Sequence, residues 1–295
     1  MFTLATEIWH PKNSETRNES SKIKIECRIA WVVDKTRSYF HDKLEMSRQG
    51  LSKLRLLDVG SCYNPFKNHQ DGDIFEVVAL DLCPASGFED EIYRCDFLDL
   101  KVSSESAQNE ASLSQVLQHS SVNPVYGCKE IESLPGSSFD VVVFSFFLEY
   151  LPDPKQRMKS CEKAWQLLKP GGLLFILRPD SNRVTPWGNI VYIKKLTLGL
   201  NLLGFRRKFY EKLTHLWCIG CVKMTEEETL QYKSSPKFMK DSSKVDYDEA
   251  FELFRISQDV KTELRNLNSK DLQQATPLSA IPELFEQLPC NEDEN

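Results

Sequence analysis

The sequence predicts a doubly wound α/β domain, in which helices cover both faces of a mostly parallel sheet. Short apolar runs alternate with helical segments along the chain, which is the order that a parallel sheet requires. Two of the runs, FDVVVFS at Phe139–Ser145 and GLLFIL at Gly172–Leu177, are nearly continuous in apolar residues. Such runs are typical of strands that are buried on both faces.

Seven strands are expected between residues 54 and 224. The parallel part of the sheet is expected to consist of Leu54–Val59, Phe75–Leu80, Glu91–Cys95, Phe139–Ser145 and Gly172–Leu177. The last two strands are Phe205–Lys212 and His215–Met224. Because these two are so close in sequence, we expect an antiparallel pair at the sheet edge.

Helices are expected between the strands and before the first of them. Apolar residues recur with a helical period over residues 23–50, so this segment is expected to pack as a lid over the edge or mouth of the domain. Further helices are expected at Lys155–Leu168, before the sequence Lys-Pro-Gly-Gly, and around Trp187–Leu203, before a glycine. Asn64-Pro65 has the pattern of an N-cap followed by proline, which predicts that another helix starts there.

Polar segments surround and interrupt the domain, which spans residues 51–224. Residues 1–22 are rich in Ser, Asn and Glu and are expected to be disordered. Residues 101–136 form a polar insertion, with one helix expected around Ala111–His119. Residues 225–295 carry more acids than bases and only a weak helical pattern near Tyr247–Leu267. We therefore expect a mostly disordered acidic tail there.

Composition excludes some classes of function. The 295 residues are 41% hydrophobic and 27% charged, which is ordinary for a globular protein. A net charge of -6 gives no overall attraction to nucleic acid, so nucleic acid is not favoured as a partner. No apolar run is long enough to cross a bilayer, and the start does not resemble a signal peptide. The nine cysteines are therefore expected to be reduced thiols, and the protein cytoplasmic or nuclear.

Small and polar residues stand at the ends of successive expected strands. Gly60 follows the first strand and Asp81 ends the second. Asp96 and Phe97 end the third strand, and Ser145 ends the fourth. Open α/β sheets bind ligands at the carboxyl ends of their strands, where the strand order reverses. Each residue alone is as well explained as a polar strand end, but together they predict a site for one nucleoside-shaped ligand.

Each of these residue types suits one part of such a ligand. Gly60 lets the backbone turn sharply and approach the ligand closely. Asp81 suits two ribose hydroxyls, and a hydrogen bond to a charged group contributes about 1.5–3 kcal/mol. Asp96 suits an adenine amino group, with the backbone around Phe97 at the ring edge. The amides that follow Asn64-Pro65 would face an anionic group such as a carboxylate.

Other polar residues are assigned structural roles. Asp58 lies within the first strand and Asp140 opens the fourth, at the end opposite the site. Glu149 is expected to face solvent or to cap a turn. CIGC at Cys218–Cys221 would place its two thiols on opposite faces of a strand, so no metal site is expected. A solvated face of an edge strand is the preferred interpretation of one basic cluster, which comprises Arg206, Arg207, Lys208 and Lys212.

The order of five motifs resembles the SAMTOR family of class I methyltransferase-like proteins, which is related to fungal ribosomal-RNA adenine-N1 methyltransferases. The motifs are LLDVGSCYNPF, VVALDLCPA, YRCDFLDL, LPGSSFDVVVFSFFLEYLPDPKQR and LLFILRPDS. The resemblance covers roughly Arg28 to Met224. It implies a seven-stranded Rossmann-like sheet with an antiparallel edge strand that binds S-adenosylmethionine. The ligand contacts that it implies are Gly60, Asp81, Asp96, Phe97 and Ser145, together with Arg28 in a segment that closes over the ligand.

The resemblance also implies a role as a sensor. In this role the ligand-free protein associates with the GATOR and KICSTOR complexes, which can recruit it to the lysosomal surface, and restrains TOR signalling until the ligand releases it. Between Phe40 and Leu54 this chain is shorter than the animal members of the family. An RNA adenine methyltransferase stays open as an alternative, because methyl transfer needs mostly positioning. A small-molecule methyltransferase is a third interpretation. The acidic balance and the lack of an acceptor-amine motif count against the RNA methyltransferase, and nothing in the sequence names an acceptor for a small-molecule enzyme.

Overall fold

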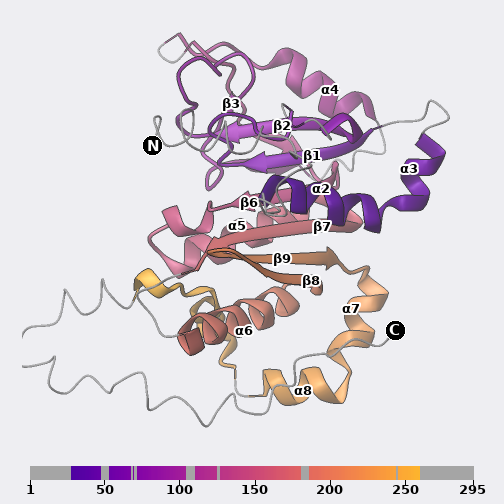
Figure 1. Ribbon diagram of the computed structural model, residues 1–295, viewed down its shortest axis with the longest axis vertical. Helices are drawn as coiled ribbons and strands as arrows, with labels where there is room; N and C mark the ends of the chain where they lie inside the picture. Colours follow the sequence, from indigo (N-terminus) through magenta and orange to yellow (C-terminus); the bar gives the residue numbers. More distant parts are fainter. Residues whose placement is uncertain are drawn as a thin grey trace, which may run out of the picture.

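The computed structural model describes residues 28–47, 53–67, 69, 72–103, 110–124, 127–180, 186–243 and 245–259. Its centre is a seven-stranded sheet with the order β3-β2-β1-β6-β7-β9-β8, which runs through the middle of the molecule in Figure 1. Strand β9 is antiparallel to both of its neighbours, β7 and β8. The other neighbouring pairs are parallel. The predicted mostly parallel sheet, with an antiparallel pair toward one edge, is confirmed.

The strands lie close to their predicted positions. They are β1 (Leu54–Val59), β2 (Phe75–Asp81), β3 (Tyr93–Arg94), β6 (Phe139–Ser145), β7 (Leu168–Pro179), β8 (Phe205–Leu213) and β9 (Leu216–Lys223). The third strand is shorter than predicted and β7 is longer. All of β1 and nearly all of β6 are buried, because helices cover both faces of the sheet. This explains why the two sequences are continuous in apolar residues.

The strand order reverses between β1 and β6. From β1 the chain moves outward through β2 to β3, and it then returns to β6 on the other side of β1. Leu56 of β1 pairs with Val141 of β6, and Val59 pairs with Phe144. The carboxyl ends of β1 and β6 are therefore adjacent, at the position where open α/β sheets bind ligands.

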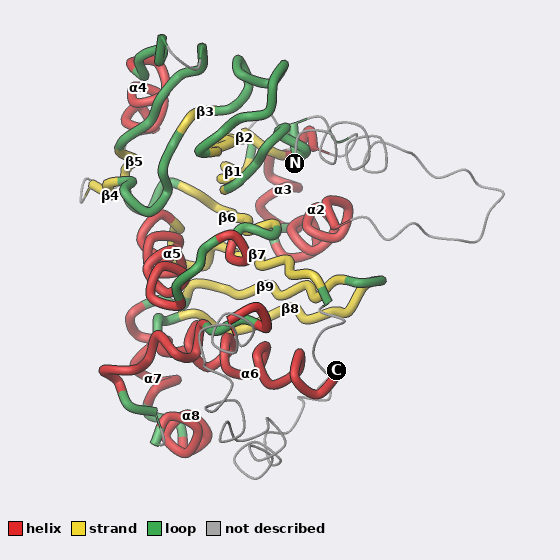
Figure 2. The backbone as a smooth tube through the Cα atoms, turned by 90° about the vertical axis from the view of Figure 1, so that its left-hand side faces the viewer, coloured by secondary structure: helices red, strands yellow, loops and turns green. Residues whose placement is uncertain are grey.

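Helices pack on both faces of the sheet. α2 (Arg28–Tyr39) and α3 (His41–Ser47) lie on one face, where the buried residues of α2 join a core with β1, β6 and β7. α5 (Pro154–Leu167) and α6 (Pro186–Leu202) lie on the other. Figure 2 shows α2 and α5 on opposite sides of β6 and β7. The helical segment predicted before the first strand is thus confirmed for residues 28–47.

The polar insertion has structure of its own. It contains β4 (Lys101–Ser103), α4 (Glu110–His119) and β5 (Ser133–Pro135), and β4 and β5 pair in a separate parallel sheet. The helix expected around Ala111–His119 is confirmed. The described helices include none that is long and apolar enough to cross a membrane.

The prediction of a mostly disordered tail is wrong for residues 225–259. This segment forms α7 (Glu226–Lys233), α8 (Pro236–Ser242) and the 3₁₀ helix η4 (Tyr247–Phe254). Local capping supports α7, because Thr225 and Glu228 form a reciprocal capping box. Four apolar residues of the segment are buried, and these are Phe238, Leu253, Phe254 and Ile256. Because the segment is mostly polar, its few buried apolar residues could not be recognised from the composition. The segments 1–22 and 260–295 lie outside the described residues.

The prediction that a helix starts at Asn64-Pro65 is also wrong. Residues 65–67 form a turn, and the next helical segment among the described residues is the short 3₁₀ helix η2 (Gly72–Ile74). Asn64 has a φ of 50°, whereas an N-cap residue normally lies in the extended region. Its side-chain amide donates to Glu91 O at 3.1 Å. Asn64 therefore stabilises the loop after β1, and the anion site expected at a helix start is absent from this position.

Candidate functional site

Gly60 turns the chain sharply at the end of β1. Its φ is 74°, which lies in the left-handed region that favours glycine. The Gly60 amide donates to Leu80 O at 2.9 Å, which ties the loop to the end of β2. A Cβ atom at Gly60 would lie 3.2 Å from Cδ2 of Phe147. Both the backbone conformation and the close approach of Phe147 therefore require glycine.

The Asp81 carboxylate stands beside this loop in a fixed orientation. It accepts hydrogen bonds from the Cys62 amide at 3.0 Å and from the Cys83 amide at 2.7 Å. Burial raises the pKa of Asp81, and these amide hydrogen bonds oppose the rise. A carboxylate has about four acceptor positions, so two amide bonds leave capacity for hydroxyl donors. The arrangement suits recognition of a diol.

Arg28 joins the lid helix to the same edge of the sheet. Its Nε donates to Ser145 Oγ at 2.9 Å, and its Nη2 donates to the Tyr63 hydroxyl at 3.3 Å. The guanidinium also lies 5.1 Å from the centre of the Phe146 ring, within cation–π range. The structure thus brings Arg28 and Ser145, two of the predicted ligand contacts, together beside Tyr63 in the loop after β1. Tyr63, which is buried, was not predicted.

Strained backbone residues cluster at this edge. Cys62 has a φ of 59° and Phe146 a φ of 61°. A bulky residue such as phenylalanine adopts this conformation only when its surroundings demand it, and such strain tends to gather at ligand sites. Phe146 is held there in part because its amide donates to Leu177 O at 2.9 Å. The ends of β1 and β6 therefore share a property that is typical of binding sites.

The third predicted strand end contributes in a different way. Phe97 is buried, and its ring lies edge-on to Phe144 and Phe147, with centroids 5.8 and 5.7 Å away. Its side chain belongs to the core, so only its backbone is placed to meet a ligand. Asp96 is exposed and accepts from the Leu98 amide at 2.9 Å. Phe147 links this region to Gly60, because it contacts both.

Asp58 lies beneath the loop and is buried. Its carboxyl accepts from Ser61 Oγ at 2.6 Å. Burial raises the pKa of Asp58 to about 7, although the Ser61 hydrogen bond and the charge of Arg28 oppose the rise. The structural role predicted for Asp58 agrees with this position, since its hydrogen bond anchors the loop that carries Gly60.

The prediction that Glu149 faces solvent is wrong. Glu149 lies in η3 (Leu148–Tyr150), and its Oε1 accepts from Arg178 Nε at 2.7 Å, with about 9% of each side chain exposed. Its Oε2 is buried with no hydrogen-bond partner among the described residues. Burial and the charges of Cys62, Glu149 and Asp81 raise the pKa of the neighbouring Tyr150. The segment after β6 therefore folds back onto the strand ends.

The remaining polar candidates take structural positions. Asp140 accepts from the Arg55 amide at 2.9 Å and from Lys169 Nζ at 3.1 Å, at the edge opposite the site. Cys218 and Cys221 belong to the cores on opposite faces of the sheet, as predicted.

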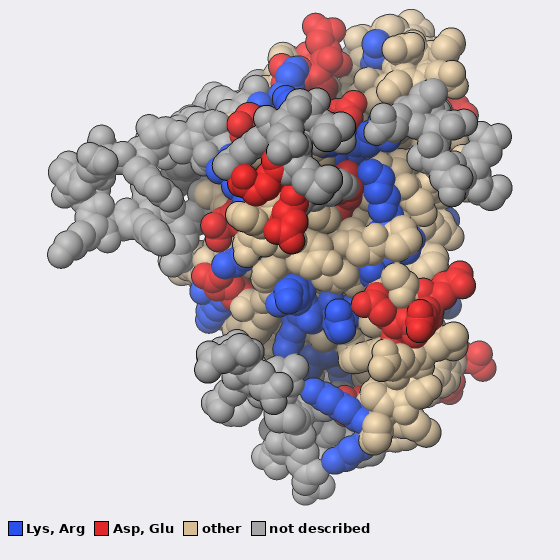
Figure 3. Space-filling view, turned by 90° about the vertical axis from the view of Figure 1, so that its right-hand side faces the viewer, with Lys and Arg blue, Asp and Glu red and all other residues tan. Residues whose placement is uncertain are grey.

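Two of the four basic residues on β8 pair with acids. Arg206 pairs with Glu228 at 3.8 Å and Lys212 pairs with Asp180 at 2.9 Å. On the face drawn in Figure 3, groups of Lys and Arg side chains likewise lie beside groups of Asp and Glu. These pairings agree with the interpretation of the cluster as a solvated face.

A sheet of this order, with a glycine turn after β1 and a carboxylate held after β2, is the Rossmann-like fold of class I methyltransferases. The chain belongs to the methyltransferase domain family, which matches residues 33–219. Two vertebrate proteins described as "S-adenosylmethionine sensor upstream of mTORC1" are similar to it. The protein of Xenopus laevis is 36% identical over 177 residues, which is 60% of this chain and 40% of the frog protein. The protein of Danio rerio is 37% identical over 175 residues, which is 59% of this chain and 41% of the zebrafish protein.

Proteins described as methyltransferases are also similar over shorter stretches. A ubiquinone biosynthesis O-methyltransferase of Idiomarina loihiensis is 45% identical over 65 residues, which is 21% of this chain and 25% of the enzyme. The chain spans about 40% of the length of the sensor relatives.

Proposed function

We propose that the chain binds S-adenosylmethionine across the carboxyl ends of β1, β2 and β6. The observation that carries the proposal is the Asp81 carboxylate, which two backbone amides hold beside the turn at Gly60. This geometry suits the two hydroxyls of a ribose, and it lies at the switch point of the sheet. The similarity to proteins described as S-adenosylmethionine sensors supports the same ligand.

Each predicted residue has a part in this proposal. Gly60 provides close backbone approach, Asp81 accepts from the ribose hydroxyls, and Asp96 accepts from the adenine amino group. The backbone around Phe97 meets the ring edge. Two residues are assigned to the methionine end of the ligand, and these are Ser145 and Arg28.

Arg28 takes the role that was expected for the helix at Asn64. Its guanidinium already lies at the end of β6, on Ser145 Oγ. A guanidinium binds a carboxylate in bidentate geometry, so Arg28 suits the carboxylate of the ligand. Because Arg28 begins α2, ligand binding would alter how the lid helix sits on the sheet.

The proposed role is that of a sensor upstream of TOR signalling. In this proposal the ligand-free protein associates with GATOR and KICSTOR, is recruited through them to the lysosomal surface, and is released when S-adenosylmethionine moves the lid. Thermodynamic linkage requires that the partners weaken ligand binding by the same factor. A pull-down of GATOR and KICSTOR subunits with and without ligand tests this role. An association that the ligand leaves unchanged would contradict it.

Isothermal calorimetry with S-adenosylmethionine tests the site itself. Asp81→Ala should weaken binding about 100-fold, because it removes two charge-assisted hydrogen bonds worth about 3 kcal/mol together. Asp73→Asn is the matched control, since it also removes one acidic charge. Asp73 precedes β2 at the opposite edge of the sheet, where its exposed side chain pairs with Arg37 at 3.2 Å. If the unmodified protein did not bind the ligand, the proposal would be wrong.

An RNA adenine methyltransferase is the alternative. Glu149 is the acid nearest in sequence to the end of β6, and its carboxylate is paired with Arg178. This ion pair counts against the methyltransferase, because it occupies the carboxylate that could otherwise act as a base. Incubation with labelled S-adenosylmethionine and ribosomal RNA separates the two functions. Incorporation of label that is lost in Asp81→Ala would favour the enzyme over a sensor without activity.

A further inference from the structure

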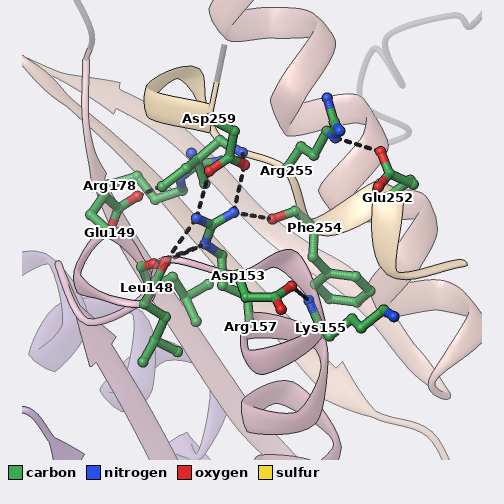
Figure 4. A network of polar contacts seen from close by, with 12 residues as sticks. Leu148, Glu149, Asp153, Lys155, Arg157, Arg178, Glu252, Phe254, Arg255 and Asp259 are labelled. Carbon is green, nitrogen blue, oxygen red and sulfur yellow. Dashed lines mark hydrogen bonds and ion pairs between the residues drawn. The ribbon is translucent and has the colours of Figure 1, made fainter. Parts of the chain in front are cut away.

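Arg157 is an arginine of α5 that is buried almost completely, with 1% of its side chain exposed. A guanidinium keeps its charge in a protein, and a buried charge is tolerated only when it is paired and hydrogen-bonded. Figure 4 shows Arg157 at the centre of a network of polar contacts. Its partners come from two segments that lie about a hundred residues apart in the sequence.

The first segment is the loop after β6. Arg157 Nε donates to Leu148 O at 3.2 Å and to Leu151 O at 3.0 Å, and Nη2 donates to Leu151 O at 2.7 Å. The second segment comprises the last residue of η4 and the residues that follow it. There Nη1 donates to Phe254 O at 3.1 Å, and both Nη atoms donate to the Asp259 carboxylate at 2.7 Å. One guanidinium thus joins the two segments.

The second segment is docked by specific packing as well. Phe254 is buried against α6, where a Cβ atom at Gly199 would lie 2.7 Å from the Phe254 ring. Asp259 is held in place because its carboxylate also accepts from the Ile256 amide at 2.8 Å. Lys155 Nζ lies 4.6 Å from the centre of the Phe251 ring. The carboxylate that binds Arg157 is therefore presented by a folded segment.

The loop after β6 carries the contacts of the candidate site. It begins after Ser145, which binds Arg28, and continues through the strained Phe146 to Phe147, whose side chain packs on Gly60. Leu148 comes next, and its carbonyl is one of those that Arg157 binds. A change in the hydrogen bonds of Arg157 would therefore reach the wall of the site within one residue.

We propose that residues 245–259 are a support of the ligand site, and that Arg157 and Asp259 are positioning residues for it. Docking of this segment neutralises Arg157 and so holds the loop after β6 in the conformation that binds the ligand. The inference rests on the proposed binding of S-adenosylmethionine. By linkage, the ligand must stabilise the docked segment by the same factor by which docking raises ligand affinity.

The test measures calorimetric affinity for S-adenosylmethionine together with amide hydrogen exchange of the full chain. Asp259→Ala should weaken binding roughly 3- to 30-fold, the range expected for residues that act through others. In the ligand-free protein it should also speed exchange at residues 146–151. Asp259→Asn, which keeps one acceptor oxygen, should give a smaller effect of the same kind and serves if the alanine variant does not fold. In the unmodified protein the ligand should slow exchange at residues 245–259.

Glu252→Gln is the matched control. It lies in the same segment and removes the same charge, but Glu252 pairs with Arg255 and makes no described contact with Arg157. It should leave affinity unchanged. If the unmodified protein binds and Asp259→Ala binds equally well, or if the ligand does not protect residues 245–259, the inference is wrong. If the unmodified protein binds no ligand, the proposed function fails instead. In that case the comparison of amide exchange at residues 146–151 between Asp259→Ala and the unmodified protein decides whether the segment supports the loop, and equal exchange would contradict it.

Discussion

The buried carboxyl of Asp58 should make the stability of this protein depend strongly on pH. Asp58→Asn is the informative substitution, because it removes the ionisable group and keeps an oxygen that can accept from Ser61 Oγ. In the unmodified protein this hydrogen bond is 2.6 Å long, and the side chain is buried beneath the loop that carries Gly60. The variant should therefore fold in the same way, but without the ionisable carboxyl group at position 58.

The magnitude follows from the pKa of Asp58. Burial raises this pKa from 3.8 to about 7, so between about pH 4 and pH 7 the folded protein holds a proton that the unfolded chain has released. Stability then falls as the pH rises through this range, by at most about 1.4 kcal/mol for each pH unit. Over the whole range the loss amounts to at most about 4 kcal/mol. Asparagine has no such loss.

Urea unfolding of both proteins at pH 4, 5, 6, 7 and 8 measures the effect. The free energy of unfolding of Asp58→Asn, minus that of the unmodified protein, should increase from pH 4 to about pH 7 and then level off. All other titrating groups are present in both proteins, so the difference between the two free energies reports Asp58 together with its charge interactions, such as that with Asp81. A difference that stays flat with pH would refute the argument that folded Asp58 keeps its proton between about pH 4 and pH 7.

Three further substitutions test two close contacts and one ion pair. Gly60→Ala places a Cβ atom 3.2 Å from Phe147 at a φ of 74°, so it should cost about 1–2 kcal/mol and lower both the melting temperature and the ligand affinity. Gly199→Ala should lower the free energy of unfolding by about 1–3 kcal/mol, because its Cβ atom would press on the Phe254 ring. Alanine favours helices more than glycine does, so a variant with a raised melting temperature would contradict this packing. Lys169→Ala removes the ion pair between Lys169 and the buried Asp140 carboxylate. It should cost about 1–2 kcal/mol in urea unfolding, because Lys169 is partly exposed and the pair is partly screened by solvent. Its calorimetric affinity for ligand should not change, because the pair lies at the opposite edge of the sheet.

Much of the fold could be predicted because its signals are local. The runs that form β1 and β6 are continuous in apolar residues, and this depends only on burial of both faces. The N-cap Asp153 with Pro154 at the start of α5 is a similarly local signal. At Asn64 the same kind of signal failed, because contacts with Glu91 hold that residue in a turn.

The site could be predicted only in part. Successive strand ends indicated Gly60 and Asp81, since parallel strands end at a common edge of the sheet. The contact of Phe147 with Gly60 and that of Tyr63 with Arg28 have no sequence pattern, because they join different elements. Glu149 was misplaced for the same reason: its partner, Arg178, lies 29 residues away.

The sequence by itself determined the order of the strands along the chain, the family, and the residues that stand at the strand ends. Periodicity and turn chemistry are properties of neighbouring residues, and these are present in the sequence. Only the tertiary structure decided that a polar C-terminal segment docks on the domain, because one buried arginine binds Asp259 from 102 positions away. A buried charge takes its partner from whatever segment the fold brings near, and no local pattern records that choice.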